Sequence, residues 1–422
     1  MRVAVAGAGA FGRNHLRVLR ELETTGLDAA GEGVALVAAV DPDAARAEEA
    51  AKQYGIPAFS SIDELLRADL KLDAACVAVP TVKHHEVAAA LLDAGLDLLV
   101  EKPLAANLGE ADDLIARAER GGRILQPGHL ERFNPAVLAV EPTLKRPMFF
   151  EAHRLSVFTP RALDVDVVLD LMIHDLDIVL TFAGSAVREV RAVGLPILSP
   201  KVDIANVRVE FESGCVANFT ASRVSTERVR KLRFFEPRQY VSIDYARRDV
   251  LVIRVDSGPP AVGQTFGRGS QDGAKESSEQ LAQAAAEFLA TGKLDAAVMQ
   301  KLAASGQIPG TLMMKVLAAK NDPEKLKEIA KNLAGPQEAP TPGRPPAPDL
   351  SPGLSFAKPE VAPGEPLRLE ISSFLDSVRK RCPPQVTARQ GRAALELALT
   401  IQATMAAHAE RAGLGDFFKS SS

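Results

Sequence analysis

The sequence has no tryptophan, only three cysteines and no long apolar run, and each shortage excludes a class of protein. Three widely spaced cysteines, an odd number, argue against a disulfide framework and against a structural zinc site. No stretch of about 18 uninterrupted apolar residues occurs, so no membrane-spanning helix is expected. Aromatic residues make up only 5% of the chain and the net charge is only −4, with no basic cluster. Neither nucleic acid nor an anionic membrane is therefore expected as a partner.

A metal site and a leader segment are also not expected. The histidines show no spacing typical of a zinc-ligand pair, among them His84, His85, His129 and His153. The first strand pattern begins at the N-terminus, which leaves no room for a signal peptide, so we expect a cytoplasmic protein. What the chain does have is 422 residues, 46% of them hydrophobic and 25% charged, which suits two or three domains with sizeable cores.

A glycine-rich run near the N-terminus is the most informative motif. It follows the apolar stretch Val3–Ala6, opens a helical pattern, and reads Gly7-Ala8-Gly9-Ala10-Phe11-Gly12. In this context Gly7 allows a tight turn, Gly9 lets the backbone approach a pyrophosphate, and Gly12 packs helix against strand. Amide groups at the helix start then hold the phosphates. The run predicts a dinucleotide site, and the alternative is a glycine turn with a structural role only.

The next strand pattern, Val34–Val40, ends on a carboxylate that bears on the choice of cofactor. Asp41 can accept hydrogen bonds from ribose hydroxyls and repel a 2′-phosphate. It lies 29 positions after Gly12, more than the usual spacing of about 20, and a polar loop accounts for the excess. No basic side chain follows at once, because the next residues are Pro42 and Asp43. The sequence therefore favours NAD over NADP, and the alternative is a strand-end Asp that caps the next helix.

The pattern of strands and helices changes twice along the chain. Residues 1–127 alternate strands with Ala-rich amphipathic stretches, which predicts an α/β fold with a doubly wound parallel Rossmann sheet. Residues 128–256, closed by helices in 365–412, predict an α+β domain with a largely antiparallel sheet around one helix at 165–182. Residues 257–364 predict an insertion with a helical part and a partly disordered proline-rich linker, either a partner-binding segment or a tolerated surface insertion. The strand candidates are 74–79, 97–100 and 123–126 in the first domain, and 148–157, 203–211, 216–223, 230–235, 240–245 and 250–255 in the second.

Glu101-Lys102-Pro103 follows the strand pattern at 97–100. Open α/β sheets bind ligands at the carboxyl ends of their strands. A lysine there would point at the nicotinamide region, where its ammonium group could stabilise an alkoxide as hydride leaves. Pro103 fixes the backbone and restrains Lys102 to extended geometry. The alternative is a surface lysine before a turn.

Asp170 and His174 are one turn apart on the same face of the predicted helix at 165–182. An imidazole poised near neutral pH can take a hydroxyl proton, and a carboxylate one turn away can orient it or raise its basicity. Asp177 is a weaker candidate for the same supporting role. The alternative is a histidine that only packs in the core.

These motifs resemble, in the same order, those of the Gfo/Idh/MocA oxidoreductase family, over about residues 1–256 and 365–412. The segment Pro80-Thr81-Val82-Lys83-His84 belongs to the same resemblance. The resemblance implies a Rossmann domain, a C-terminal α/β domain with a largely antiparallel sheet, and reversible oxidation of a sugar or cyclitol hydroxyl. It implies Lys102 as the catalytic lysine and His174 as the proton acceptor, with Asp170 beside it. One departure is Met172, where the family usually has glycine.

The resemblance also assigns candidate binding residues. Those implied at the cofactor are Gly7, Gly9, Ala10, Phe11, Gly12, Asp41, Pro80, His84 and Glu101, and those implied at the substrate are Lys102, Arg132, Asn134, Asp170 and His174. By analogy with the family, a homodimer or homotetramer is expected. A free-sugar or inositol dehydrogenase and a non-catalytic NAD-binding regulator both stay open as alternatives, because a dehydrogenase fold does not guarantee turnover.

Residues 128–137 together with 168–175 resemble one branch of the family, the UDP-N-acetylglucosamine 3-dehydrogenases. These supply a 3-keto sugar nucleotide to an aminotransferase on the way to diamino-sugar lipid A. Arg132 offers a fork that suits a diphosphate or a sugar oxygen, and Asn134 can both donate and accept. The alternative for this segment is a helix start, with Asn134 as its cap and Pro135 at the first position.

Overall fold

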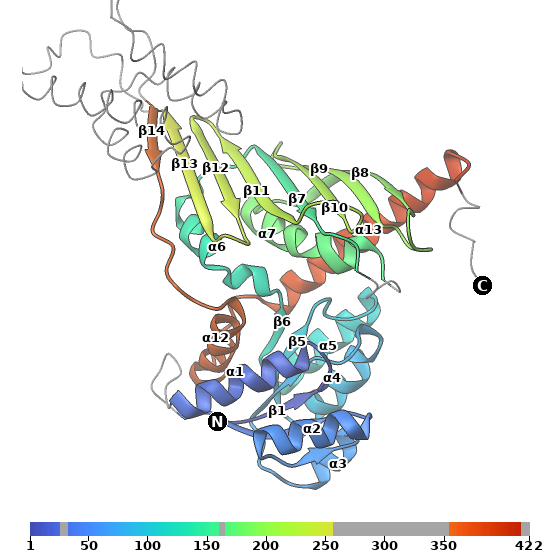
Figure 1. The fold of residues 1–422 in the computed structure, drawn as a ribbon, viewed down its shortest axis with the longest axis vertical. Coiled ribbons are helices and arrows are strands. Elements are labelled where there is room, and N and C mark those ends of the chain that lie inside the picture. The colour runs from blue at the N-terminus through green and yellow to red at the C-terminus, as the bar shows by residue number, and fades with distance from the viewer. Residues whose placement is uncertain (26–32, 160–164, 256–353, 415–422) are drawn as a thin grey trace, which may run out of the picture. The chain divides into compact units, whose positions relative to one another are not determined.

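The computed structural model describes residues 1–25, 33–159, 165–255 and 354–414 (Figure 1). The chain divides into two compact units, Met1–Leu251 with Lys358–Ser422, and Val252–Ala357. Of the second unit, the described residues are only the end of strand β13 (Asp249–Val255) and strand β14 (Leu354–Ala357), which pair antiparallel. The helical segments and most of the proline-rich tract expected in the insertion lie outside the described residues.

The first sheet is parallel throughout, with the strand order β3-β2-β1-β4-β5-β6. Its central strands are buried on both faces, which is typical of a parallel sheet covered by helices on each side. The Rossmann-type α/β prediction is confirmed. The strands are β1 (Arg2–Ala6), β2 (Ala35–Val40), β3 (Ala58–Phe59), β4 (Ala74–Val77), β5 (Asp97–Glu101) and β6 (Leu125–Gly128), and the helices are α1 (Gly12–Thr25), α2 (Ala44–Tyr54), α3 (Ile62–Arg67), α4 (His84–Asp93) and α5 (Leu108–Gly121).

The second sheet is mostly antiparallel, in the order β14-β13-β12-β11-β7-β10-β9-β8. The prediction of a largely antiparallel sheet is confirmed, and one pair is the exception, because β7 and β10 run parallel. A helix and a hairpin intervene between these two strands, so the chain crosses over and enters the sheet again in the same direction. The remaining strands are β7 (Phe149–Leu155), β8 (Val187–Leu195), β9 (Ile204–Phe211), β10 (Val216–Ser222), β11 (Val229–Glu236) and β12 (Gln239–Asp244).

Strand β8 was not among the strands expected from the sequence. It carries Arg188, Glu189 and Arg191, so its apolar residues do not alternate cleanly with polar ones. It lies at one edge of the second sheet, where charged side chains hinder pairing with another chain. Its strand conformation therefore depends on its partner β9 rather than on a local pattern.

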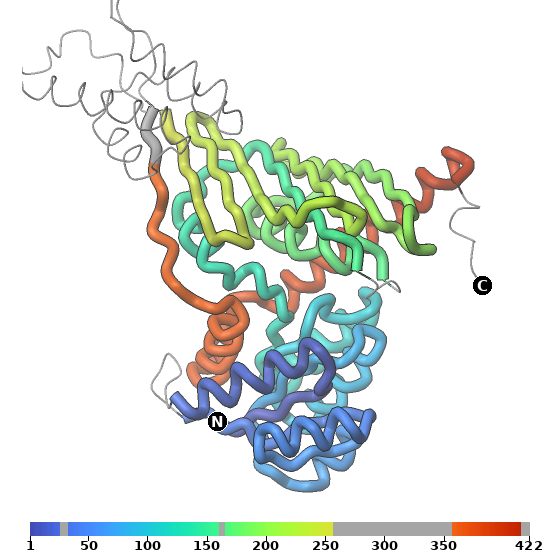
Figure 2. The backbone as a smooth tube through the Cα atoms, in the orientation of Figure 1, coloured from blue at the N-terminus to red at the C-terminus, as the bar shows by residue number. Residues whose placement is uncertain are grey.

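Helices complete both parts of the first unit. They are α6 (Pro135–Val140), α7 (Ile173–Ala183), α12 (Pro366–Lys380) and α13 (Ala388–Arg411), with the short turns η1 (Thr81–Lys83), η2 (Leu130–Phe133) and η3 (Glu141–Thr143) and the π-helical turn η4 (Val168–Met172) directly before α7. Figure 2 follows the backbone from the first sheet in blue, through the second in green and yellow, to the C-terminal helices in orange and red. Helix α13 contacts α7 and β8 in one part, and α5 and β6 in the other.

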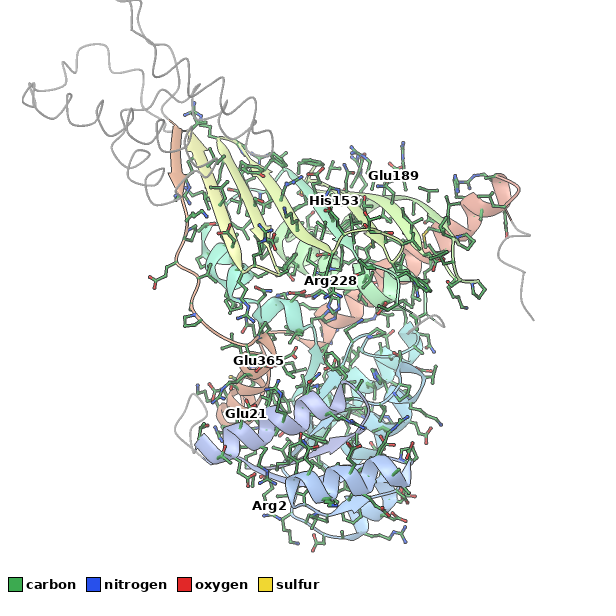
Figure 3. All side chains as sticks on the ribbon, in the orientation of Figure 1. Arg2, Glu21, His153, Glu189, Arg228 and Glu365 are labelled. Carbon is green, nitrogen blue, oxygen red and sulfur yellow. The ribbon has the colours of Figure 1, made fainter. Side chains whose placement is uncertain are left out.

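Helix α12 belongs to the core of the first sheet. Its apolar residues Leu367, Ile371, Phe374 and Val378 lie in the same buried cluster as residues of β1 and α1. Arg17 of α1 forms ion pairs with Glu21 and with Glu365 at the start of α12. Figure 3 labels these two glutamates. The sequence analysis grouped residues 365–412 with the second domain, whereas this packing ties α12 to the Rossmann sheet.

Candidate active site

The glycine run forms the turn between β1 and α1, and two of its glycines are required by the turn itself. Gly7 has a φ of +95°, and a Cβ atom there would lie 2.5 Å from the carbonyl oxygen of Ala78. A Cβ at Gly12 would lie 1.8 Å from the carbonyl oxygen of Gly7. At Gly9, in contrast, a Cβ would meet nothing within 4 Å. The turn therefore leaves open space at Gly9, where the dinucleotide prediction places the pyrophosphate.

Asp41 supports this glycine turn. Its buried carboxylate accepts a hydrogen bond from the Ala8 amide at 2.8 Å and another from the Asp43 amide at 2.9 Å. The cap of α2 is Asp43, which accepts from the amides of Ala45 and Arg46. Asp41 is therefore not the helix cap that the alternative interpretation suggested. A carboxylate has about four acceptor positions, so Asp41 can still accept from ribose hydroxyls.

A cavity of about 720 Å³ opens at the carboxyl ends of these strands. Gly9, Phe11, Asp41 and Pro80 line it, which brings together residues from three of the predicted cofactor motifs. Its volume is in the range of ordinary cofactor and ligand sites. Arg46 also lines this cavity and forms an ion pair with Asp43 at 3.3 Å. The sequence analysis missed this basic group because Arg46 comes from the first turn of α2, beyond the residues that follow Asp41 directly.

His84 and Glu101 make their contacts inside the protein. The ring nitrogens of His84 lie 2.8 Å from the Pro103 carbonyl oxygen and 2.9 Å from that of Val79, and burial lowers the pKa of this imidazole. Glu101 lies 2.7 Å from His15 of α1. His84 thus contacts the backbone of Pro103, the residue that follows Lys102. Its geometry fits a positioning role, and direct contact with the cofactor stays a prediction for both side chains.

Lys102 leaves β5 and contacts the π-helical turn η4. Its ammonium group donates to the carbonyl oxygen of Asp170 at 2.8 Å and to that of Leu169 at 3.4 Å. Burial lowers the pKa of Lys102, while the negative charges of Asp170 and Glu101 act in the opposite direction. The Lys102–Pro103 peptide bond is cis. The structure therefore brings together Lys102 and the segment that carries Asp170 and His174, which are 68 or more residues apart in sequence.

His174 lies in the first turn of α7, next to this contact. Burial lowers its pKa well below the ordinary value, and the positive charges of Lys102 and Arg154 lower it further. The imidazole is therefore neutral near pH 7 and able to accept a proton. Its buried Nδ1 atom has no hydrogen-bond partner within the described part of the chain.

Arg132 and Asn134, which the resemblance places at the substrate, are both buried. Arg132 donates to the hydroxyl of Thr181. The side chain of Asn134 accepts from the Ala136 amide at 3.1 Å, and its NH₂ group donates to Glu131 at 3.0 Å. Asn134 is thus the cap of α6, with Pro135 at the first position, as the structural alternative predicted. A role for these two residues at a substrate stays a prediction.

Sequence reasoning missed Arg154, which shapes the electrostatics of the site. Arg154 is buried in β7 and donates to both carboxylate oxygens of Asp175, at 2.7 and 3.0 Å, and to Glu131 at 3.0 Å. The ring of Tyr245 lies 5.2 Å from its guanidinium carbon. The alternation of residues along the strand could have indicated that Arg154 is buried. Every second residue of a strand faces the same side, and Phe150, Ala152 and Arg154 all point inward.

Neither a metal-binding cluster nor a membrane-spanning helix is found in the part of the chain that the structure describes. No group of three or more His, Cys, Asp or Glu side chains is placed there to hold a metal ion. Within the same residues, no helix is long and apolar enough to cross a membrane.

Comparisons with known proteins agree with this fold. Residues 1–129 match the GFO/IDH/MocA oxidoreductase family with an NAD-binding Rossmann fold, and residues 137–237 match the GFO/IDH/MocA C-terminal domain. A UDP-N-acetylglucosamine 3-dehydrogenase from Acidithiobacillus ferrooxidans is 36% identical over 259 residues, which are 61% of this chain and 78% of that protein. A solved structure of this dehydrogenase superposes with a TM-score of 0.69 and 27% identity, and covers 96% of this chain and 98% of its own. A scyllo-inositol 2-dehydrogenase from Bacillus subtilis is 28% identical over 240 residues, 53% of this chain and 68% of that protein.

Proposed function

This chain belongs to the Gfo/Idh/MocA oxidoreductase family, and on that premise we propose that it uses NAD to oxidise the C3 hydroxyl of UDP-N-acetylglucosamine to a 3-keto sugar nucleotide. The observation that carries the chemistry is the contact of Lys102 with the turn directly before His174. The sugar nucleotide is supported by the 36% identity with the dehydrogenase from A. ferrooxidans.

The residues present fit a dinucleotide. The open space at Gly9, the cavity beside it and the carboxylate of Asp41 would hold the pyrophosphate and a ribose. When bound, the nicotinamide ring supplies a hydride acceptor. His174, kept neutral by burial, accepts the proton of the substrate hydroxyl. Lys102 donates to the same oxygen and stabilises its developing negative charge.

We propose NAD rather than NADP as the cofactor because the carboxylate of Asp41 lines the cavity and would repel a 2′-phosphate. Arg46 lines the same cavity, but its partner Asp43 compensates its charge. The proposed setting is the cytoplasm, with the keto product passed to an aminotransferase for diamino-sugar lipid A. In this proposal the protein is a homodimer or homotetramer, as the family analogy implies.

A second candidate is a dehydrogenase of inositol or of a free sugar. The specific observation in its favour is that Arg132 and Asn134 are buried and form hydrogen bonds with other residues of the chain. Neither side chain is therefore placed as an evident ligand of a diphosphate. The relationship with the inositol dehydrogenase from B. subtilis supports the same candidate.

The deciding experiment mixes the purified full-length protein with NAD and, separately, UDP-N-acetylglucosamine, myo-inositol and free hexoses. The absorbance of reduced nicotinamide is followed, and any keto product is trapped with an added aminotransferase. Reduction of NAD only with the sugar nucleotide supports the proposal. Reduction with a free polyol instead supports the second candidate, and binding of NAD without turnover on any of them contradicts both and favours a regulator.

A further inference from the structure

His15 is a fully buried polar residue in the helix that begins at the glycine turn. It lies three residues after Gly12, at the start of α1, and is 0% exposed. Its Nε2 atom lies 2.7 Å from Oε1 of Glu101, and an ionised carboxylate only accepts, so Nε2 is the donor. Its Nδ1 atom has no hydrogen-bond partner in the described part of the chain. A buried imidazole that makes one polar contact calls for an explanation, and that contact is with the residue before Lys102.

Glu101 is held from two sides at the end of β5. His15 of α1 contacts one carboxylate oxygen. On the other side, Gly128 of β6 lies directly opposite Glu101 in the parallel pair of strands. A Cβ atom at Gly128 would lie 3.1 Å from Oε2 of Glu101 and 3.1 Å from its Cα atom, closer than most real contacts. The position of the Glu101 carboxylate is therefore set by a helix and a strand that lie far apart in the sequence.

Fixing Glu101 also fixes the start of the next residue, Lys102. On its other side, the carbonyl oxygen of Pro103 lies 2.8 Å from the ring of His84 in α4. Lys102 thus lies between two residues that hydrogen bonds hold in place. From there its ammonium group donates to the carbonyl oxygen of Asp170 at 2.8 Å. The direction of the lysine side chain depends on both neighbours.

The ring of His15 also contacts a residue of the cofactor cavity. Its centroid lies 5.9 Å from that of the Phe11 ring, and the two planes meet at 56°, an ordinary geometry for a pair of rings. Phe11 lines the cofactor cavity and is 44% exposed. A series of direct contacts and one peptide bond therefore leads from the cavity through Phe11, His15 and Glu101 to Lys102.

We propose that His15 is a positioning residue of the reaction, which holds Glu101 so that Lys102 leaves β5 toward the substrate oxygen, and which links this arrangement to the cofactor cavity through Phe11. The inference rests on the proposed function, since it requires Lys102 to act on a substrate oxygen. His15 acts through Glu101 and Lys102 rather than on the reacting atoms. A displacement of about 1 Å at a catalytic group can cost about a hundredfold in rate, so a distant hydrogen bond can matter.

The test compares His15→Met with His15→Gln, using NAD and the sugar nucleotide or polyol that proves to be oxidised. Methionine fills much of the same volume without a donor, whereas the glutamine amide can donate from nearly the position of Nε2. We expect kcat to fall about tenfold to a hundredfold in His15→Met, with little change in KM, and to be largely restored in His15→Gln. A wild-type kcat in His15→Met would overturn the inference, and so would an equal loss in both variants.

The matched control is His85→Met. His85 of α4 lies 2.8 Å from Asp113 of α5, an imidazole–carboxylate contact of the same kind in the same domain. This variant should keep the kcat of the wild type. A loss of kcat as large as that in His15→Met would show that any such contact matters equally, which contradicts a specific role for His15.

Gly128→Ala tests the same arrangement from the other side of Glu101 and decides the matter if His15→Met does not fold. The added methyl group forces Glu101 to move by a few tenths of an ångström while His15 stays in place. We expect kcat to fall with little change in KM, as in His15→Met. A folded Gly128→Ala variant with the kcat of the wild type would overturn the inference.

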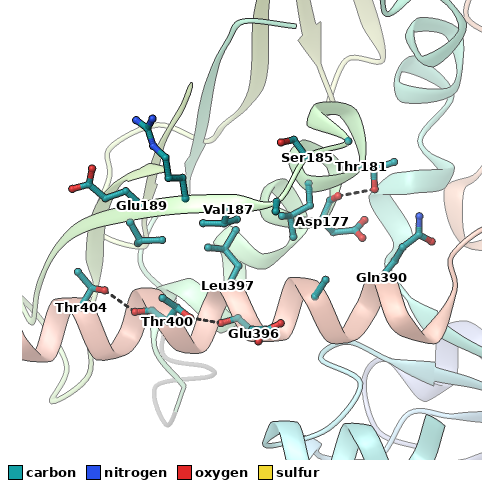
Figure 4. A pocket seen from close by; sticks show the side chains of 16 residues that line it. Asp177, Thr181, Ser185, Val187, Glu189, Gln390, Glu396, Leu397, Thr400 and Thr404 are labelled. Atoms are coloured by element: carbon teal, nitrogen blue, oxygen red, sulfur yellow. Dashed lines mark hydrogen bonds between the residues drawn. The ribbon is translucent and has the colours of Figure 1, made fainter. Parts of the chain in front are cut away.

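A readout that needs no turnover follows the ε-methylene signal of Lys102 by NMR across pH in the full-length protein. Burial lowers the pKa of Lys102 and Arg154 lowers it further, while the charges of Asp170 and Glu101 oppose the shift. Glu101→Gln removes one opposing charge, so the titration should move to lower pH. Glu396→Gln is the control, because it removes an exposed carboxylate of α13 at a separate cavity of about 810 Å³ between α7, β8 and α13 (Figure 4).

The same NMR signal separates failure of the inference from failure of the proposed function. The titration of Lys102 should change in His15→Met, where Glu101 is no longer held, and stay near that of the wild type in His15→Gln. If it is unchanged in His15→Met, the inference is wrong even where NAD is reduced. If it changes there and no hydroxyl substrate is oxidised, only the proposed function fails.

Discussion

Asp41 combines two contacts on which the choice of cofactor depends. It holds the amide of Ala8 in the glycine turn, and it presents a carboxylate to the cofactor cavity. A negative charge at this position disfavours a 2′-phosphate by direct repulsion, and the neighbouring Arg46 is held by Asp43. If the proposed preference for NAD is correct, it depends on this one side chain and its immediate partners.

We predict that Asp41→Ser lowers kcat/KM with NAD about tenfold to a hundredfold, the range that the loss of one or two hydrogen bonds to a charged group gives. The ratio of kcat/KM for NADP to that for NAD should rise, because the repulsion is removed. Steady-state kinetics with both cofactors measure the ratio. Glu48→Gln, which removes an exposed carboxylate of α2 that does not line the cavity, serves as the control. An unchanged ratio in Asp41→Ser would show that Asp41 does not select the cofactor.

Glu370 is a second residue whose environment decides its behaviour. It is fully buried in α12, and neither carboxylate oxygen has a hydrogen-bond partner among the described residues. Burial raises its pKa well above the ordinary value of 4.5, and the charges of Glu101 and Asp177 add to the shift. Folding therefore keeps a proton on Glu370 at a pH where the unfolded chain releases it.

The raised pKa of Glu370 predicts in which direction the stability of the fold changes with pH. An acid whose pKa is raised by folding makes its full contribution to stability below the unfolded value near 4.5 and loses it as pH rises toward the folded value. In Glu370→Gln the new side chain has nearly the same shape as glutamic acid but does not titrate, so this variant does not lose stability as pH rises. We expect its Tm to exceed that of the wild type by about 1–2 °C at pH 8 and by less at pH 5, as about 1 kcal/mol would give. A Tm difference that does not grow with pH would contradict this explanation.

At the scale of the elements, α13 is positioned by a glycine that the sequence pattern did not single out. A Cβ at Gly391 would lie 2.5 Å from Cγ of Pro127 in β6 and 3.6 Å from Nε2 of His129. The helix approaches the first sheet closely at this point, and farther along it packs on α7 and β8. A single long helix thus contacts both sheets of the unit.

We predict that Gly391→Ala destabilises the protein by about 1–3 kcal/mol, because the added methyl group overpacks the contact with Pro127. Gly109→Ala in α5 is the matched control, since its nearest neighbour there is the side-chain oxygen of Asn107 at 3.4 Å. Helix propensity alone should make Gly109→Ala neutral or more stable by about 0.5–1 kcal/mol. Chemical denaturation of both variants measures the difference, and equal effects would contradict the overpacking.

At the scale of the whole molecule, the first sheet depends on a helix that arrives after more than two hundred further residues. Phe374 of α12 is fully buried in the same cluster as Leu16 and Leu19 of α1. Part of the apolar surface of α1 is therefore covered only when the C-terminal part of the chain has folded back. Stability of the NAD-binding part and of the C-terminal helices should be coupled in one transition.

We predict that Phe374→Ala lowers the free energy of unfolding by about 3–5 kcal/mol, as expected for a large buried aromatic side chain. Because α12 is part of the Rossmann core, the Tm should fall as well, while NAD, which binds only the folded protein, should still raise the variant's Tm. Val82→Ala, at a position 76% exposed, is the control and should change neither quantity. Retention of wild-type stability in Phe374→Ala would show that α12 is not part of this core.

The sequence by itself determined the features that depend on neighbouring residues. The glycine run, its flanking strand and helix, the buried parallel strands and the cap of α6 at Asn134 follow from local rules of turns, hydrophobic period and capping. The oxidoreductase family followed from the joint order of such motifs. The roles of Lys102 and His174 stay a prediction, which their juxtaposition supports.

Only the tertiary structure decided where long-range pairs form, because burial, sheet direction and charge are set by segments far apart in the sequence. It made β10 parallel to β7 and placed α12 in the Rossmann core. It also brought His129 against Asp177, which no local pattern indicated. Burial at this contact lowers the pKa of His129, an effect that exists only in the folded chain.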